Sequence, residues 1–367
     1  MKYNGTTKVH IRSTDKFLIY TSRSQKEKAM CSYSTLTEFV LEGLTHHSEL
    51  QLPLFLFLGI YGVTMLGNLG MILLIAFNSK LQSPIYFFLG NLSFLDLFYS
   101  SVVTSKLLGN FVWEKNVISY PGCMTQLFFF CGFAIGECFM LSAMANDRYV
   151  AICNPLLYNV TMSPKVCNAL VIGVYTISTF GALAHTVAMT RVSFCGDNVI
   201  QHYFCDIYPL LKLSCSSTHV NVLLVILVGG FNLLTTTSTI FIFYAFIIVS
   251  ILRICSAEGR SKSFGTCGSH LTAIEVFYGS LIFMYFKPSD STSSMAQENV
   301  ASVFYTTMIP ILNPLIYNKD VKNVLKNVMG EKIRNHMDGV GNIECPESCM
   351  ISHFYPLSYI PLNFFCF

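Results

Sequence analysis

Long apolar segments recur along this chain and are separated by short polar ones. Each is about as long as the roughly 20 residues that a helix needs to cross the hydrocarbon layer of a membrane. Seven such spans are expected, at residues 50–79, 85–103, 120–147, 166–186, 222–252, 264–286 and 300–317. Several contain glycine or proline, which membrane helices tolerate. The pattern predicts an all-α membrane protein built as a bundle of seven transmembrane helices.

The composition supports a membrane protein. Hydrophobic residues make up 53% of the 367 residues and charged residues 12%, whereas about a quarter of a soluble domain is charged. The net charge of +3 is too small to indicate binding to nucleic acid. Residues 1–29 are polar and basic and lack the apolar core of a secretory signal. The first membrane helix is therefore expected to act as the targeting signal.

The distribution of lysine and arginine predicts the orientation in the membrane, because basic residues favour the cytoplasmic side. With the N-terminus outside, eleven basic residues lie in cytoplasmic segments and five in outer loops. Residues 1–29 oppose this arrangement with seven lysines and arginines, but there is none between Met30 and the first span. We interpret 1–29 as an extension or an alternative start. We expect a multi-pass protein of the plasma membrane with its N-terminus outside.

Three regions follow from these spans: an extracellular segment at 1–50, the helix bundle at 51–318 and a cytoplasmic tail at 319–367. In the tail, Val321, Val324, Leu325 and Val328 share one helical face, with lysines elsewhere. That pattern predicts a short amphipathic helix on the membrane surface after the seventh span. Asn4 begins a glycosylation sequon, which is absent if translation starts at Met30.

Short motifs follow one another in a fixed order along the spans. They are Gly67-Asn68 in the first span, Pro84-Ile85-Tyr86-Phe87-Phe88-Leu89 at the second, Met144-Ala145-Asn146-Asp147-Arg148-Tyr149 ending the third, Ser263-Phe264-Gly265-Thr266-Cys267 at the sixth, and Pro310-Ile311-Leu312-Asn313-Pro314 in the seventh. From about Met30 to Lys326 the chain resembles the vertebrate olfactory receptors of the tetrapod-type class. These belong to the rhodopsin-like G-protein-coupled receptors.

The chain departs from this family at three places. Asn146 stands where a tyrosine is usual, and Glu275 stands where the family has a small or apolar residue. Asn318 and Lys319 follow Tyr317 directly, without the few residues, including an arginine, that usually come between. These departures concern folding and coupling to a signalling partner.

The resemblance implies a receptor in which a small volatile odorant shifts the population of conformations towards an active one. The active state would engage the olfactory stimulatory G protein and raise cyclic AMP. The residues implied in coupling and activation are Asp147, Arg148, Tyr149, Tyr244, Asn313, Pro314 and Tyr317. An acid beside an arginine at the end of a span can also form a local ion pair that releases Arg148 on activation. An ordinary interfacial arginine is the alternative.

One face of the third span is apolar, because its residues recur at steps of three and four. The resemblance places the ligand pocket between this face and the fifth and sixth helices. The residues implied are Leu127, Phe130, Cys131, Ala134, Ile135, Val228, Asn232, Tyr278, Leu281 and Tyr285. A largely apolar lining with a few hydroxyl and amide groups suits a small volatile with one polar group. Plain packing between helices is the alternative interpretation.

Two acids, Asp96 and Glu137, fall inside the spans. A charge at the middle of a bilayer costs roughly 2.5 kcal/mol or more, so both are expected to face the interior of the bundle. There they could share a proton or hold a monovalent cation. The resemblance implies a sodium ion, with help from Asn68 and Asn313. A water-filled polar cluster is the alternative, and we expect no other cofactor and no other metal site.

Four cysteines are expected on the outer side, where thiols tend to be oxidised: Cys123, Cys195, Cys205 and Cys215. Four cysteines allow three pairings. The resemblance implies Cys123 with Cys205 and Cys195 with Cys215.

No set of residues has the pattern of a catalytic site, so we do not expect an enzyme. A transporter or channel would show repeated halves or rings of charge, which the sequence lacks. An amine receptor would want an acid on the outer half of the third span, and none is present there. A rhodopsin-like receptor for another small ligand, or a receptor-like product that does not signal, stays open.

Overall fold

The computed structural model describes residues 37–41, 51–113, 116–195 and 198–285, and, within the seventh span, 306–307, 309–314 and 316–317. The sequon at Asn4, the predicted amphipathic helix after Tyr317 and the side chain of Tyr285 lie outside the described residues. The division of the chain at 1–50 and 319–367 therefore stays a prediction.

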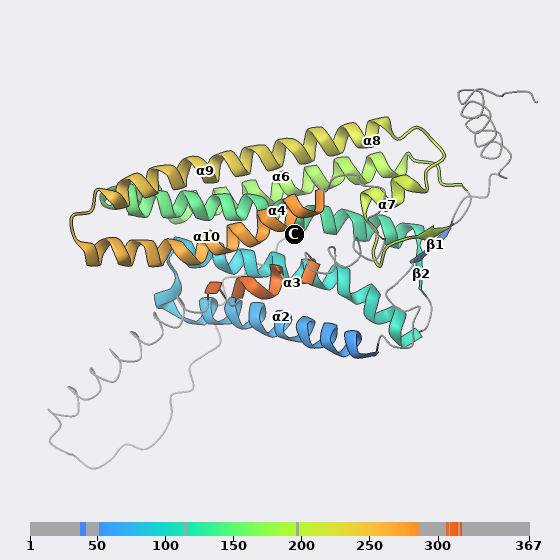
Figure 1. Ribbon diagram of the computed structural model, residues 1–367, viewed down its shortest axis with the longest axis horizontal. Helices are drawn as coiled ribbons and strands as arrows, with labels where there is room; N and C mark the ends of the chain where they lie inside the picture. Colours follow the sequence, from blue (N-terminus) through green and yellow to red (C-terminus); the bar gives the residue numbers. More distant parts are fainter. Residues whose placement is uncertain are drawn as a thin grey trace, which may run out of the picture. The chain divides into compact units, whose positions relative to one another are not determined.

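The predicted spans one to six each coincide with a helical segment to within two residues or lie inside it, and these segments lie side by side (Figure 1). The segments are α2 (Gln51–Phe77), α3 (Pro84–Trp113), α4 (Tyr120–Cys153), α6 (Pro164–Thr190), the run α8 (His219–Leu224), η4 (Val225–Gly229) and α9 (Gly230–Leu252), and α10 (Ala257–Tyr285). Among the described residues, five of these segments are long and apolar enough to cross a membrane. The described parts of the seventh span are also helical.

Short helical turns connect the long helices. They are η2 (Ser79–Leu81), η3 (Pro155–Leu157), α5 (Tyr158–Thr161) and α7 (Ile207–Lys212). The fifth span begins at His219, earlier than the predicted residue 222, and contains the π-helical turn η4. Such turns widen a helix locally and are frequent at functional sites.

Helix α4 is the centre of the bundle, because it packs against α3, α6 and α9. It begins at Tyr120, where the Ser119 hydroxyl accepts a hydrogen bond from the backbone N–H of Gly122 at 3.2 Å. This cap satisfies one of the free N–H groups at the start of a helix. At the other end, Pro155 follows and cannot continue the helix.

Large apolar side chains cover the outward faces of the peripheral helices. Leu66 and Phe77 on α2 and Phe241 on α9 are between 73% and 78% exposed. In water such exposure would mark an interaction surface. On helices of this length and hydropathy it marks the faces that contact lipid.

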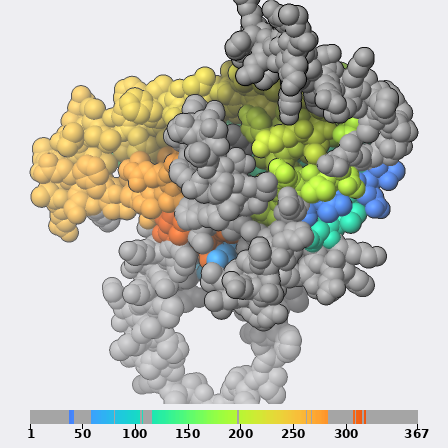
Figure 2. All heavy atoms as spheres, turned by 45° about the vertical axis from the view of Figure 1, so that its right-hand side comes forward, coloured from blue at the N-terminus to red at the C-terminus, as the bar shows by residue number. Residues whose placement is uncertain are grey.

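A small sheet closes one end of the bundle, and the sequence had not led us to expect it. Strand β1 (Glu38–Leu41) pairs antiparallel with β2 (Val117–Ser119) and parallel with β3 (Val199–Ile200), so that the order is β2-β1-β3. Phe39 lies opposite Ile118 and is fully buried. Figure 2 shows the blue atoms of β1 beside the yellow-green atoms of the loop that carries β3. We call the end of the bundle that this sheet closes the sheet end.

Both disulfides that the resemblance implied are present, which confirms the pairing. Cys123 at the start of α4 is bonded to Cys205 in the long loop between α6 and α8, with 5.5 Å between their Cα atoms. Cys195 is bonded to Cys215 within that loop, with a Cα separation of 5.7 Å. The two bonds attach the loop to the bundle and to itself.

Gly181 allows α6 to approach α4 closely, and this predicts a stability difference between two glycines of α6. A Cβ atom at Gly181 would lie 2.7 Å from Cδ1 of Ile135, whereas one at Gly173 would meet no atom within 4 Å. We expect Gly181→Val to lower the free energy of unfolding by about 1–3 kcal/mol, as overpacking does. Gly173→Val is the matched control. Equal melting temperatures for the two purified variants would contradict this account.

Candidate functional site

The loop between α6 and α8 dips into the sheet end of the bundle. Tyr203, Phe204 and Cys205 are at most 2% exposed. The Tyr203 hydroxyl forms a hydrogen bond of 2.7 Å with the Thr306 hydroxyl of the seventh span. The ring centroids of Phe204 and Phe130 lie 4.9 Å apart. We call residues 202–206 the lid, because they contact both α4 and the seventh span.

Beneath the lid, the structure brings together most of the residues predicted to line a pocket. Leu127, Phe130 and Cys131 on α4 are buried. One turn further along α4, Ile135 lies against Gly181. Ala134 and Leu281 are partly buried.

Side chains of η4, α9 and α10 approach this face of α4. A Cβ atom on Gly181 would lie 3.8 Å from Cγ1 of Val228 and 4.0 Å from Nδ2 of Asn232, so both side chains reach the same place as Ile135. On α10, Tyr278 lies close to Thr236 and Cys138. That these residues touch a ligand stays a prediction, but Ile135, Val228 and Asn232 are observed to meet at Gly181 of α6.

Asn232 gives this region a polar side chain that can form a further hydrogen bond. Its side chain is 7% exposed, and its Nδ2 atom has no acceptor among the described residues. A buried donor without a partner costs about 1–3 kcal/mol. A carbonyl or hydroxyl oxygen of a small ligand would supply the missing acceptor.

The two predicted intramembrane acids are completely buried and close to one another. The Asp96 carboxylate accepts hydrogen bonds from Nδ2 of Asn313 at 2.9 and 3.2 Å. Glu137, 1% exposed, interacts electrostatically with Asp96. Asn68 donates to the backbone carbonyl of Pro310 at 2.8 Å, while its Oδ1 atom is buried without a donor among the described residues. Asp96 and Glu137 thus lie together between α3 and α4, and Asn313 and Asn68 contact or belong to one turn of the seventh span beside them.

Glu275 does not join this cluster within the described part of the chain. Its side chain is exposed on α10. Nothing in the structure explains why this position carries an acid.

At the opposite end of the bundle, Asp147 is held by a residue that the sequence analysis missed. The Tyr158 hydroxyl donates to the Asp147 carboxylate at 2.8 Å, and Asp147 is 1% exposed. The hydrogen bond to the Asp147 carboxylate therefore comes from α5. The positive charge of Arg148 also contributes to the electrostatic environment of Asp147. Tyr149 points the other way and stacks on Phe243 of α9, with 5.1 Å between ring centroids.

A second pair at this end joins α9 to α10. The Tyr244 hydroxyl and Nδ1 of His270 are 2.6 Å apart, and both side chains are at most 5% exposed. Arg148 acts electrostatically on both. The sequence alone does not indicate this pair, because only the packing of α9 on α10 brings Tyr244 to His270.

The seventh span approaches α2 at the glycine of the first motif. A Cβ atom on Gly67 would lie 3.1 Å from Cγ of Pro314, so a larger residue would push the two helices apart. Tyr317, 2% exposed, lies one turn beyond Pro314. The predicted activation residues therefore form two groups, one around Asp147, Arg148 and Tyr244 and one around Asn313 and Pro314.

Burial changes the ionisation of two lid residues that lie outside the membrane-spanning segments. It lowers the pKa of His202 to about 4, and the charge of Lys212 acts in the same direction. It raises the pKa of Asp206 to about 6, although the Asp206 carboxylate accepts a hydrogen bond from the backbone N–H of Ile207 at 2.7 Å.

Comparisons with known proteins agree on one family. A family model described as Olfactory receptor matches residues 57–332. Olfactory receptor 8D4 of Homo sapiens is 58% identical over 306 residues, which cover 82% of this chain and 97% of the relative. Olfactory receptor 8A1 of Mus musculus is 59% identical over 304 residues, covering 82% and 98%.

Among solved structures, squid rhodopsin resembles this chain with a TM-score of 0.56. The match covers 72% of this chain and 75% of that one, at 18% identity. At this identity the likeness concerns the fold alone, which is that of a seven-helix receptor.

The two lid residues predict opposite dependences of stability on pH. The unfolded chain has a His pKa of about 6.5 and an Asp pKa of about 3.9. Between about pH 6.5 and 4 the unfolded state binds more protons at His202, so acid destabilises the fold through His202. Between about pH 6 and 4 the folded state binds more protons at Asp206, so acid stabilises the fold through Asp206.

We therefore expect the melting temperature of His202→Gln to rise, relative to that of the unaltered protein, as the pH falls from 7 to 4.5. That of Asp206→Asn should fall over the same range. Glu258→Gln, at an exposed position on α10, is the control. If both lid variants kept the pH profile of the unaltered protein, these ionisation states would be wrong.

Proposed function

The chain belongs to the olfactory receptor family, and from this premise we propose that it signals from the plasma membrane through the olfactory stimulatory G protein and raises cyclic AMP. Membership of the family makes it an odorant receptor of the G-protein-coupled class and a multi-pass membrane protein, not an enzyme. The observation that carries the proposal is the family match over residues 57–332, which spans the whole helix bundle.

The odorant is proposed to bind beneath the lid, between α4, α9 and α10. The walls there are largely apolar, as around Ile135 and Val228, and the buried amide of Asn232 offers a hydrogen-bond donor. This combination suits a small molecule with an apolar body and one oxygen acceptor. Because Asn232 lies on α9, an odorant bound to it would change the position of α9 relative to α4.

Activation is proposed to separate α10 from α4 at the end that carries Arg148. The hydrogen bond between Tyr244 and His270 ties α9 to α10 in this conformation. A ligand that favours the open conformation must bind it more tightly than the closed one. In the open state Tyr244 would be released from His270, and Arg148 would become accessible to the G protein.

The proposed orientation places the sheet end outside the cell. The two disulfides lie at this end, and disulfides persist in oxidising surroundings. The count of basic residues supports the same orientation. The opposite end, with Arg148, would then face the cytoplasmic G protein.

A sodium ion is proposed as a further component of the bundle. The residues that would hold it are Asp96 and Glu137, with the side-chain oxygen of Asn68 nearby. Two acids buried together, without a basic partner among the described residues, fit a monovalent cation. The ion would stabilise the closed bundle, because it bridges elements that move apart on activation.

Signalling is tested by measuring cyclic AMP in cells that express the form starting at Met30 together with the olfactory G protein. A panel of small volatile alcohols, aldehydes and ketones is applied. We expect a concentration-dependent response for some members and its loss in Arg148→Ala, because Arg148 would contact the G protein. Arg191→Ala, at the sheet end after α6, should respond normally. No response from receptor that is demonstrably on the cell surface would contradict the proposed signalling.

The sodium proposal is tested on purified receptor by its melting temperature in sodium chloride and in choline chloride. A ligand that binds only the folded state stabilises it by mass action, so sodium should raise the melting temperature. Asp96→Asn and Glu137→Gln should abolish the difference between the two salts. Glu275→Gln, which removes an exposed acid from α10, should retain it. A sodium effect that survives in both cluster variants would exclude this site.

A further inference from the structure

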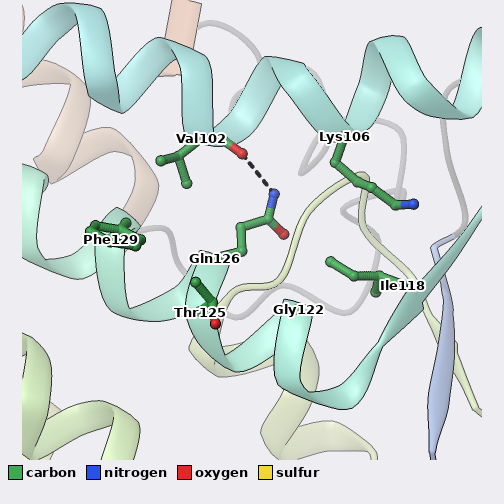
Figure 3. A pocket seen from close by; sticks show the side chains of 7 residues that line it. All are labelled: Val102, Lys106, Ile118, Gly122, Thr125, Gln126 and Phe129. Atoms are coloured by element: carbon green, nitrogen blue, oxygen red, sulfur yellow. Dashed lines mark hydrogen bonds between the residues drawn. The ribbon is translucent and has the colours of Figure 1, made fainter.

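A groove opens at the sheet end of the bundle between α3, β2 and α4 (Figure 3). Its volume is about 340 Å³. Its lining combines apolar side chains with one amine, one amide and one hydroxyl: Val102, Lys106, Ile118, Gly122, Thr125, Gln126 and Phe129. Neither the proposed odorant site nor the G-protein end accounts for this groove.

The groove and the proposed odorant site are lined by different residues of α4. An α-helix has 3.6 residues per turn, so Gly122, Thr125 and Phe129 point to one side of α4. Leu127, Cys131 and Ala134 point to another side, whereas Phe130 lies one turn beyond Gln126. The lining of the groove includes none of the ten residues predicted to contact an odorant. The two binding spaces therefore have different linings.

Lys106 gives the groove a positive charge. Its ammonium group donates one hydrogen bond, to the backbone carbonyl of Val117 at 2.6 Å. An ammonium group carries three donors, so it can bind a further acceptor. The described residues that line the groove include no acid. Burial lowers the pKa of Lys106, and a negatively charged partner would oppose that shift, because it favours the charged form.

The position of the groove relative to the membrane favours an amphiphile. The second span is predicted to end at residue 103, and Lys106 lies about one turn beyond it on α3, at the level where lysines reach the polar interface. Phe129 lies deeper along α4 and is 42% exposed. A molecule in the groove would have its polar end beside Lys106 and its apolar end towards the lipid.

Gln126 forms a rigid back wall. Its Nε2 atom donates to the carbonyl of Val102 at 2.9 Å, and its Oε1 atom accepts from the backbone N–H of Cys205 at 3.0 Å. The side chain is 6% exposed, and the amide joins α3, α4 and the lid. A groove held in shape by such bonds loses little conformational freedom when a ligand enters.

We propose that this groove binds a single-chain anionic amphiphile, a long-chain carboxylate. The carboxylate accepts hydrogen bonds from the Lys106 ammonium, and the chain lies along Val102 and Phe129 towards the bilayer. Binding pockets for small ligands range from roughly 300 to 1,000 Å³. The groove is at the lower end of that range, which fits one chain better than a two-chain phospholipid.

The test is photolabelling of the full chain in phosphatidylcholine nanodiscs with a diazirine-bearing long-chain fatty acid. We expect labelled peptides from the sheet end of α3 and α4. Lys106→Gln should reduce labelling about tenfold, the loss expected for one charge-assisted hydrogen bond. Lys106→Arg should retain most of it, and Lys165→Gln, which removes a lysine at the start of α6, should change nothing. Comparable melting temperatures for the variants confirm that each one folds.

Two further probes separate the alternatives. A diazirine alcohol of the same chain length should label weakly, and unlabelled fatty acid should compete with the carboxylate probe. Equal labelling by the alcohol, unchanged labelling in Lys106→Gln, or labelled peptides elsewhere in the chain would each overturn the proposal. Competition by phosphatidylglycerol but not by fatty acid would assign the groove to a phospholipid and overturn it too. The readout is binding, so it does not depend on any odorant response.

Discussion

The arrangement of this receptor depends on how polar groups are satisfied inside a bilayer. Lipid offers no hydrogen bonds, so a polar side chain within a span must turn inwards and find a partner. Three pairs inside the bundle follow from this constraint: Asp96 with Asn313, Asn68 with the carbonyl of Pro310, and Tyr244 with His270. Each joins two different helices, so the pairs that remove the polar groups from lipid also hold the helices in register.

Helix α4 connects the functional regions, because each has a residue on it. Phe130 meets the lid, Glu137 belongs to the acid cluster, and Asp147 is held by Tyr158. Gln126 forms the wall of the groove. A rigid central helix of this kind keeps the sites at fixed separations. Movement between states is therefore assigned to the helices around α4, above all to α10.

The sequence predicts what depends on local pattern and misses what depends on the path of loops. Hydropathy located the spans, and family resemblance implied both disulfides. The sheet was not predicted, because its strands have only two to four residues and the paired residues lie far apart in the sequence. The hydrogen-bond partners Tyr158, His270 and Thr306 were not predicted, because the sequence pattern does not specify how each helix is rotated about its axis. Sequence reasoning therefore identified Asp147 and Tyr244 without the residues that hold them.

The lid joins the groove to the interior of the bundle through consecutive residues. Cys205 donates its backbone N–H to Gln126 and is bonded to Cys123, while Tyr203, two residues earlier, is hydrogen-bonded to Thr306 of the seventh span. That span also carries Asn313, the partner of Asp96. A contiguous set of bonds does not by itself couple two sites, since coupling requires an element with two states that both ligands bias. The lid has the position that such an element needs, because it forms the roof of the proposed odorant site and is bonded to the back wall of the groove. Only if a carboxylate beside Gln126 and an odorant each favoured one of two lid conformations would each change the affinity of the other, and then by the same factor.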